Sequence, residues 1–320
     1  YFSFVITSAI VGFFKLNKFD YILSESPPLF LGITALFLKK TKRAKLIFNV
    51  SDLWPESAEK LGIVTNKMAL NLSTKLEHFI YRHSDLITGQ TKGICKSISD
   101  RFPNKKVYWL PNGVDLNYYD VNKIKSNWRN ENNFSEHDFI LLYAGVLGHA
   151  QGLEVILKAA NNLKSNSKIK FVIIGSGPEK DKLLNLKKSL QLENVFFYNT
   201  TTKAQMPAII AACNAAIIPL KKLDLFKGAI PSKIFENLAM KKPILLGVGG
   251  EAKEMFIDEG KCGFYYTPED EIDLTDKILY LFKNPIELTL LGENGYQYVK
   301  EKFNREQIAE YLNKLLNTHN

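Results

Sequence analysis

Short apolar runs alternate with longer amphipathic stretches along most of this chain. In the first third, runs of four to six residues predict strands at Phe19–Ser24, Lys45–Val50, Asp85–Gly89 and Val107–Leu110. Helical patterns lie before and between these runs, at 1–14, 30–38, 67–82 and 91–101. Strands that alternate with helices in this way are typical of a parallel sheet with both faces covered.

A second series of the same kind follows residues 117–138, which are polar, lack apolar periodicity and are interpreted as a linker. Its predicted strands are Phe139–Ala144, Ile169–Ile174, Val195–Tyr198, Ala215–Ile218 and Pro243–Leu246. We therefore predict two Rossmann-like, doubly wound α/β domains, at 1–118 and 139–298, with a linker at 119–138 and a C-terminal helix within 299–320.

Glycine and polar residues gather where the predicted strands end or in nearby loops, at 51–55, 111–115, 145–152, 175–178 and 228–233. Ligands of doubly wound sheets bind at the carboxyl ends of the strands, so we expect a binding site at this edge. Gly145 and Gly148 would let the backbone approach a ligand closely. The alternative is that they only form a tight turn between strand and helix.

The segment 228–243 predicts a loop, a helix and a return to a strand. Pro231 suits the first turn of a helix, and Ser232 and Lys233 would stand at its N-terminus, which favours an anion. Glu236 follows one turn later on the same face and could accept hydrogen bonds from two hydroxyl groups. This pattern fits a nucleotide, with the diphosphate at the helix tip and the ribose on Glu236. The alternative is an ordinary amphipathic helix with a surface glutamate.

Composition places the chain among soluble globular proteins, with 46% hydrophobic and 23% charged residues. Its three cysteines are scattered without a Cys-x-x-Cys spacing, which argues against a disulfide framework or a zinc site and suits the cytoplasm. The start of Gly175-Ser-Gly177 resembles a dinucleotide fingerprint, but Lys180 stands where the third glycine belongs, which argues against a nicotinamide enzyme. Asp52 ends a predicted strand as a candidate base or hydrogen-bond acceptor, or alternatively as a helix N-cap.

The net charge of +9 is uneven, because the first 120 residues carry +6 and the remaining 200 carry +3. The densest basic run, Lys39, Lys40, Lys42 and Arg43, directly follows the apolar segment 30–38. Basic side chains beside apolar surface can lie on anionic lipid, so we expect peripheral attachment to the inner face of the cell membrane. The alternative is a solvated helix end. No recognised nucleic-acid module occurs, and no nucleic-acid partner is expected.

Six motifs, taken together and in this order, resemble family 4 glycosyltransferases of the GT-B fold. They are Ser26-Pro-Pro-Leu-Phe30, Val50-Ser-Asp-Leu-Trp-Pro-Glu56, Pro111-Asn-Gly-Val-Asp115, Gly145-x-x-Gly-x-Ala-Gln-Gly-Leu153, Gly175-Ser-Gly-Pro178 and Pro231-Ser-Lys-x-x-Glu236. The resemblance runs from about Asp20 to the C-terminus. Within the family, the chain looks most like bacterial enzymes that add amino- or deoxy-sugars, such as L-fucosamine, during O-antigen or capsule assembly.

This resemblance implies an acceptor-side first domain and a nucleotide-sugar-binding second domain that face each other across a cleft. It implies transfer with retention of configuration from a nucleotide sugar, with UDP as the expected nucleotide, to a polyprenyl-diphosphate-linked saccharide, without a metal or another cofactor. Residues carried over for the donor are Gly145, Gly148, Gln151, Gly175, Gly177, Pro231, Ser232, Lys233 and Glu236. Asp52 takes the place of the common cleft histidine.

The chain departs from the family pattern at several positions. Val146 and Gln151 stand where many members have arginine and lysine, and Gly228 stands where they have a second glutamate. The resemblance also implies that about 80 residues of a first domain of normal size are absent before Tyr1. Two alternatives stay open: a truncated, non-catalytic relative that binds only nucleotide sugar or membrane, and a sugar-nucleotide epimerase of the same fold.

Overall fold

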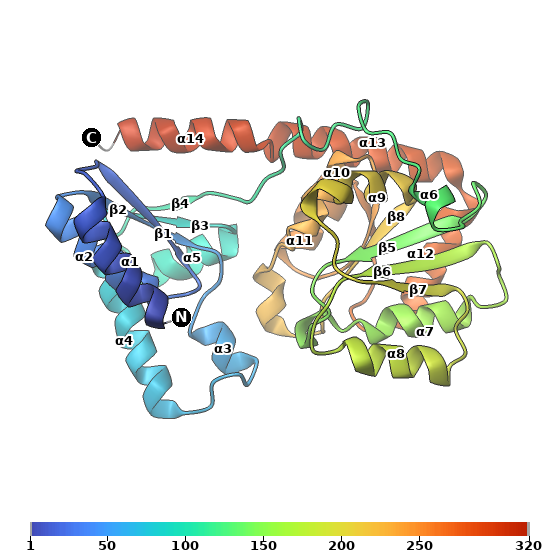
Figure 1. The fold of residues 1–320 in the computed structure, drawn as a ribbon, viewed down its shortest axis with the longest axis horizontal. Coiled ribbons are helices and arrows are strands. Elements are labelled where there is room, and N and C mark those ends of the chain that lie inside the picture. Colours follow the sequence, from blue (N-terminus) through green and yellow to red (C-terminus); the bar gives the residue numbers. More distant parts are fainter. Residues whose placement is uncertain (1, 319–320) are drawn as a thin grey trace. The chain divides into compact units, whose positions relative to one another are not determined.

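The computed structural model describes residues 2–318, and the chain divides into two compact units at 1–111 and 112–320. Each unit is built on its own parallel sheet with helices around it (Figure 1). The prediction of two Rossmann-like α/β domains is confirmed. The division follows Pro111, seven residues before the boundary that we expected from the sequence.

The first unit has a four-stranded parallel sheet in the order β1-β2-β3-β4. Its strands are β1 Tyr21–Ser26, β2 Lys45–Val50, β3 Leu86–Gly89 and β4 Val107–Trp109. Its helices are α1 Phe2–Lys15, α2 Leu31–Lys42, α3 Glu56–Lys60, α4 Lys67–His83 and α5 Lys92–Arg101. Phe48, Ile80, Tyr81 and Ile87 are fully buried at the centre of this unit.

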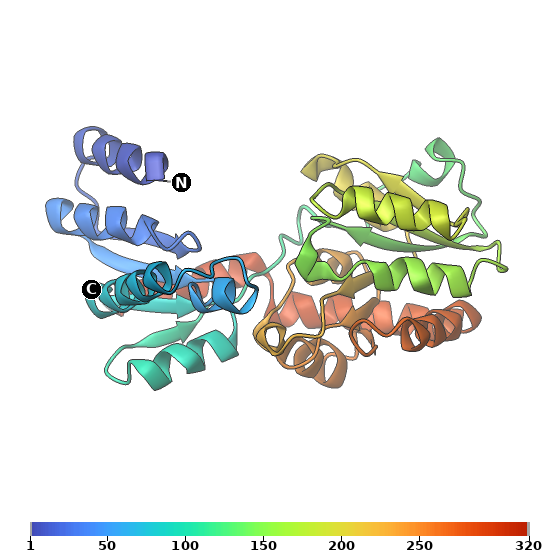
Figure 2. The same ribbon diagram turned by 90° about the horizontal axis from the view of Figure 1, so that it is seen from below.

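Helix α1 packs along α2, beside which it lies in both ribbon views (Figures 1 and 2). Gly12 permits this close approach, because a Cβ at this position would lie 2.8 Å from a methyl carbon of Leu38. Lys42 Nζ donates to the carbonyl oxygens of Phe13 and Leu16, each at 2.7 Å, and thereby satisfies the last turn of α1. Elsewhere α1 carries exposed apolar side chains, namely Phe4, Ile6, Ile10, Val11 and Phe14.

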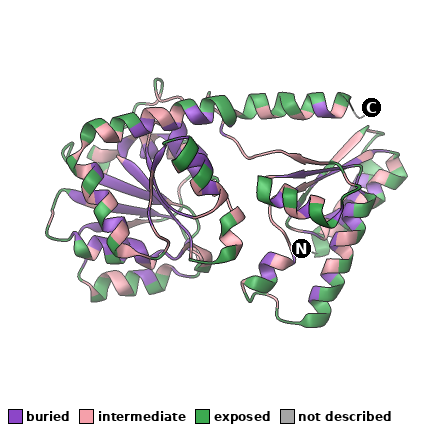
Figure 3. Cartoon of the chain, turned by 180° about the vertical axis from the view of Figure 1, so that it is seen from behind, coloured by how far each residue is buried: buried purple, intermediate pink, exposed green. Residues whose placement is uncertain are grey.

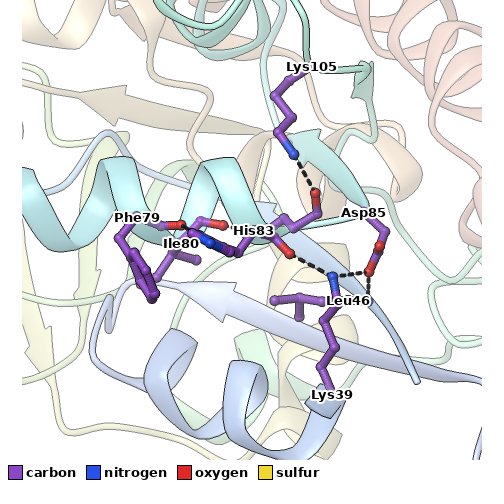
Figure 4. Close-up of polar contacts among 8 residues, drawn as sticks. Lys39, Leu46, Phe79, Ile80, His83, Asp85 and Lys105 are labelled. Atoms are coloured by element: carbon purple, nitrogen blue, oxygen red, sulfur yellow. Dashed lines mark hydrogen bonds and ion pairs between the residues drawn. The ribbon is translucent and has the colours of Figure 1, made fainter. Parts of the chain in front are cut away.

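A polar cluster ties the end of α2 to the starts of β2 and β3 (Figure 4). Lys39 Nζ lies 2.7 Å from Asp85 Oδ2 and donates to the carbonyl oxygen of His83 at the same distance. Asp85 Oδ2 also accepts a hydrogen bond from the backbone nitrogen of Leu46 at 2.6 Å. Two residues of the predicted membrane-facing run, Lys39 and Lys42, thus use their ammonium groups for contacts inside this unit, whereas Lys40 and Arg43 are exposed.

The second unit has a six-stranded parallel sheet in the order β10-β9-β8-β5-β6-β7. Its strands are β5 Phe139–Ala144, β6 Ile169–Ile174, β7 Val195–Tyr198, β8 Ala215–Pro219, β9 Ile244–Gly247 and β10 Gly263–Tyr265. Its helices are α6 Trp128–Glu131, α7 Glu154–Asn162, α8 Lys180–Ser189, α9 Met206–Ala212, α10 Lys233–Ala239, α11 Glu251–Lys253, α12 Glu271–Lys283, α13 Pro285–Lys302 and α14 Arg305–Asn317.

The strand order of this sheet reverses beside β5, because the chain runs outward through β6 and β7 and then returns to β8 on the other side of β5. Helices α7, α8 and α12 share one buried apolar cluster with β5 and β6, while α10 packs on α13. The central strands β5, β6, β8 and β9 are almost entirely buried, and the edge strands β7 and β10 are partly exposed (Figure 3). A reversal of this kind leaves a crevice at the carboxyl ends of the strands, where such sheets bind ligands.

The segment predicted as a linker, 119–138, is attached to the second unit and contains α6. The Arg129 guanidinium donates to the carbonyl oxygens of Ala212, Ser135 and Asp138 at 2.7 to 2.9 Å. The Phe134 side chain is buried. Trp128 and Phe134 contact the rings of Tyr198 and Phe196, so a few scattered side chains make this attachment and the segment shows no apolar periodicity. At the other end, 299–302 belongs to α13, and the final helix begins at Arg305.

Candidate functional site

A cavity of about 300 Å³ lies at the carboxyl edge of the sheet in the second unit. The ends of β5 and β6, the loop after β7 and helix α10 form its walls. The lining residues are Ala144, Gly145, Val146, Ile174, Gly175, Ser176, Thr200, Thr201, Met206 and Glu236. Its volume is at the lower end of the range of small-molecule sites. Gly145, Gly175 and Glu236, which the sequence analysis singled out separately, line this one cavity.

The two glycine-containing loops on the wall pack against each other through their backbones. Gly175 has a φ of +152°, and a Cβ there would collide with the carbonyl oxygen of Gly145. Backbone hydrogen bonds join the loops, from Gly145 N to Ile174 O at 2.9 Å and from Leu147 N to Ser176 O at 2.8 Å. Glycine is therefore required at 175 for the loops to meet, and their meeting exposes backbone to the cavity.

Lys233 lies directly behind the first glycine loop. A Cβ at Gly145 would be 3.0 Å from Lys233 Nζ, and this nitrogen lies 4.0 Å from the centre of the Tyr143 ring. Burial lowers the pKa of Lys233 from its usual 10.5 to about 8, although the nearby charge of Glu236 opposes this shift. An anion placed against the Gly145 loop would supply the stabilisation that this ammonium group lacks.

A smaller cavity of about 100 Å³ shares Glu236 with the larger one. Its other lining residues are Asn112, Gly113, Val114, Asp115, Tyr118, Tyr119, Lys203, Ser232 and Arg305. Backbone hydrogen bonds fasten the floor of the cavity, from Val114 N to Phe303 O at 2.9 Å and from Arg305 N to Val114 O at 3.0 Å. The cavity thus joins the start of the second unit to the beginning of its last helix.

Several predicted donor-site residues line neither cavity. Gly148 and Gln151 face each other within the loop after β5, where a Cβ on Gly148 would be 2.8 Å from Gln151 Oε1. Gly177 packs on the backbone of Leu147, and Pro231 precedes Ser232, the exposed N-cap residue of α10. These positions support the walls of the site, and their direct contact with a donor stays a prediction.

Asp52 lies in the first unit, where its Oδ2 accepts a hydrogen bond from Ser57 Oγ at 2.7 Å. Pro55 holds the N-cap position of α3, so the alternative interpretation of Asp52 as a helix N-cap is wrong. The side chain of Asp52 is half-buried. A catalytic role for it stays a prediction.

The third wall of the larger cavity, formed by Thr200, Thr201 and Met206, was not predicted from the sequence. The two threonines follow the predicted strand Val195–Tyr198 closely. They could therefore have been predicted in the same way as the glycine loops, from their position at the carboxyl end of a strand. Lys203 and Arg305 are different, since no local pattern connects residues so far apart in the chain.

Among residues 2–318, no three His, Cys, Asp or Glu side chains are grouped so as to hold a metal ion. None of the helices in this part of the chain combines the length and the apolar character needed to cross a membrane. The groups that the larger cavity offers are therefore backbone amides, hydroxyls and the Glu236 carboxylate, with the Lys233 ammonium behind its wall.

The family model for glycosyl transferases group 1 matches residues 124–298. The probable glycosyltransferase WbjE of Pseudomonas aeruginosa is 26% identical over 312 residues, covering 90% of this chain and 74% of WbjE. The putative colanic acid biosynthesis glycosyl transferase WcaI of Escherichia coli is 25% identical over 248 residues, covering 72% of this chain and 59% of WcaI.

Solved structures of GT-B glycosyltransferases have the same fold. HepE of Anabaena, in complex with UDP and glucose, superposes with a TM-score of 0.78 at 16% identity, covering 99% of this chain and 82% of HepE. Sucrose-phosphate synthase of Thermosynechococcus elongatus superposes with a TM-score of 0.74 at 18% identity, covering 94% of this chain and 73% of the synthase.

Proposed function

The chain belongs to the group 1 glycosyl transferases, and on this premise we propose that it transfers a sugar from a UDP-sugar to a hydroxyl group of a lipid-linked saccharide, with retention of configuration. The observation that carries the proposal is the larger cavity, which combines Glu236 with the backbones of Gly145 and Gly175. Lys233 stands behind this wall with its pKa lowered by burial to about 8.

Base, ribose and diphosphate of the donor each have a complementary group at this cavity. The Glu236 carboxylate accepts hydrogen bonds from the ribose hydroxyls, and the Gly145 loop and Lys233 receive the diphosphate. The base lies against the wall formed by Thr200, Thr201 and Met206. UDP is bound in similar solved structures, HepE with UDP and glucose and the pneumococcal O-GlcNAc transferase GtfA with UDP and GlcNAc, which supports this choice of donor.

The chemical contribution of these residues is to position the donor and to stabilise the departing diphosphate. As the bond between sugar and phosphate breaks, negative charge builds up on the phosphate oxygens beside Lys233 and the backbone amides of the Gly145 loop. Donors that are fixed before the reaction stabilise such charge without a cost of reorganisation. The proposal needs no metal or other cofactor.

The proposed acceptor is a polyprenyl-diphosphate-linked saccharide, and the proposed process is the synthesis of a cell-surface polysaccharide such as O-antigen or capsule. The name of WcaI, a putative colanic acid biosynthesis enzyme, supports this process. The motifs resemble those of L-fucosamine-type transferases, so the proposed donor sugar is an amino- or deoxy-sugar.

Mass spectrometry of the products from a panel of UDP-sugars and a polyprenyl-linked disaccharide would test this function. We expect an acceptor extended by one sugar, formed only when both substrates are present and strongly reduced with the Glu236→Ala variant at low donor concentration. Proton NMR of the product should show the anomeric configuration of the donor. UDP binding without any product would instead support the non-catalytic relative, and an altered donor sugar without acceptor would support the epimerase.

We also propose peripheral attachment of the first unit to an anionic membrane at the cytoplasmic face. Lys40 and Arg43 are exposed at the end of α2, and exposed apolar side chains cover the outer side of α1. A basic residue near an anionic surface contributes about 1 kcal/mol, so replacing both by serine should weaken binding to phosphatidylglycerol-containing vesicles by about 30-fold.

Vesicle co-sedimentation at increasing salt concentrations measures this effect, and binding of the unmodified protein should decrease as salt rises. The matched control replaces Lys158 and Lys164, two exposed lysines of the second unit, by serine. Equal losses in the two double variants, or binding that ignores salt, would contradict the proposed surface.

A further inference from the structure

The Tyr119 hydroxyl is a buried polar group without a protein partner at the edge of the donor site. Its side chain is only 3% exposed and lines the smaller cavity together with Glu236. Within residues 2–318, no group meets the geometry of a hydrogen bond with this hydroxyl, although the Glu236 carboxylate is near enough to influence its pKa. Buried polar groups of native proteins nearly always have a partner, so the hydroxyl is expected to meet one that is supplied from outside the chain.

Hydrogen bonds of the backbone fix the position of Tyr119, and its hydroxyl group remains neutral. The backbone nitrogen of Tyr119 donates to the Asp115 carbonyl oxygen at 3.0 Å, within a loop that is itself fastened to Phe303 and Arg305. Burial raises the pKa of Tyr119 above its usual value of 10, and the nearby Glu236 carboxylate, as a negative charge and as an acceptor, raises it further. The phenol therefore keeps its proton at physiological pH and can donate a hydrogen bond.

Other polar groups of this cavity already have partners. Asp115 Oδ1 accepts hydrogen bonds from the backbone nitrogens of Asn117 and Tyr118. The Arg305 guanidinium donates to the carbonyl oxygen of Gly113 at 3.1 Å, and Lys203 Nζ lies 5.5 Å from the centre of the Tyr118 ring. The volume of about 100 Å³ admits a hydroxyl-bearing edge of a ligand, but is too small for a whole nucleotide.

We propose that Tyr119 is a second contact for the donor ribose, donating a hydrogen bond to a ribose hydroxyl that Glu236 binds, and thereby selects ribonucleotides over deoxyribonucleotides. The inference rests on the proposed function. A carboxylate only accepts hydrogen bonds, so each ribose hydroxyl that donates to Glu236 still has lone pairs free. The Tyr119 phenol supplies the matching donor from the cavity on the other side of Glu236.

A deoxynucleotide would leave both Glu236 and Tyr119 without that partner. Sites built to bind a hydroxyl group reject the analogue that lacks it, because their own buried polar groups are then left unpaired. The two residues together therefore predict stronger discrimination than a carboxylate alone.

Isothermal calorimetry with UDP, 2′-deoxy-UDP and 3′-deoxy-UDP, on the 320-residue chain and its Tyr119→Phe variant, tests the inference. Loss of one hydrogen bond to a neutral group should weaken UDP binding by about threefold to tenfold. The preference for UDP over one of the two deoxy analogues should fall by the same factor, because that analogue has already lost the contact.

Tyr266→Phe is the matched control, since Tyr266 is also fully buried with an unpartnered hydroxyl but lines neither cavity. It should leave all three affinities unchanged. Unchanged affinities in Tyr119→Phe, or equal weakening for UDP and both analogues, would overturn the ribose contact. If the unmodified chain binds no UDP, the proposed function itself fails, and this inference fails with it.

Discussion

Replacing Glu236 by alanine is expected to weaken UDP binding by about 10-fold to 150-fold. Glu236 lines both of the cavities described above, and in the proposed function its carboxylate accepts hydrogen bonds from two ribose hydroxyls. Hydrogen bonds to a charged group contribute about 1.5 to 3 kcal/mol, and their loss also leaves the Tyr119 hydroxyl facing an empty space. Calorimetric titration with UDP measures the change directly.

Two further variants separate this role from a general effect on folding. Glu236→Gln keeps the shape and one acceptor oxygen, so its UDP affinity should lie between those of the unmodified chain and Glu236→Ala. Glu193→Ala removes an exposed carboxylate that lines neither cavity and should leave the affinity unchanged. UDP binding that is equally strong in Glu236→Ala and in the unmodified chain would refute the ribose assignment.

The second large effect is a pH dependence of UDP binding that comes from Lys233. The pKa of Lys233 is about 8 in the unliganded chain, and the bound diphosphate would hold the ammonium group charged. Above pH 8, binding must therefore be accompanied by uptake of a proton, and the UDP affinity should fall by about tenfold between pH 7 and pH 9. Calorimetry across this pH range gives the profile.

Substitutions at 233 test whether this titration belongs to Lys233. Lys233→Arg keeps its charge at every pH in the range and should flatten the profile. Lys233→Met should also flatten it, at an affinity about 10-fold to 150-fold lower at pH 7, because a charged contact to phosphate is lost. A profile that falls equally steeply in Lys233→Met would assign the pH dependence to another group.

The lowered pKa of Lys233 also affects the free energy of unfolding, which changes with pH in the direction opposite to the UDP affinity. Because the pKa of Lys233 in the folded chain is about 8 and its usual value is 10.5, the unfolded chain binds more protons between these two pH values. The contribution of Lys233 to the free energy of unfolding therefore rises with pH in this window. A loss of UDP affinity between pH 8 and pH 9 thus cannot be attributed to unfolding driven by this lysine.

Most of the fold could be predicted from local patterns. The strands at 45–50, 139–144 and 169–174 have the predicted bounds, because strands buried on both faces of a parallel sheet appear as continuous apolar runs. The three-residue strand β10 was missed, because it is too short to form such a run. The segment 119–138, expected as a linker, belongs to the second unit, because hydrogen bonds from Arg129 to Ala212 and Asn214, which leave no periodic pattern, attach it there.

Some features of the candidate site could also be predicted from local sequence patterns, whereas others depend on tertiary packing. The sequence by itself determined which residues are available, since glycines at strand ends and the Pro-Ser-Lys-x-x-Glu pattern are local features that mark the edge of a doubly wound sheet. Only the tertiary structure decided that Lys233 lies behind Gly145 with a lowered pKa, and that Lys39 is paired with Asp85. It alone brought Tyr119, Lys203 and Arg305 to one cavity with Glu236. Burial and distance set pKa values and partners, and both arise when segments far apart in the chain pack together.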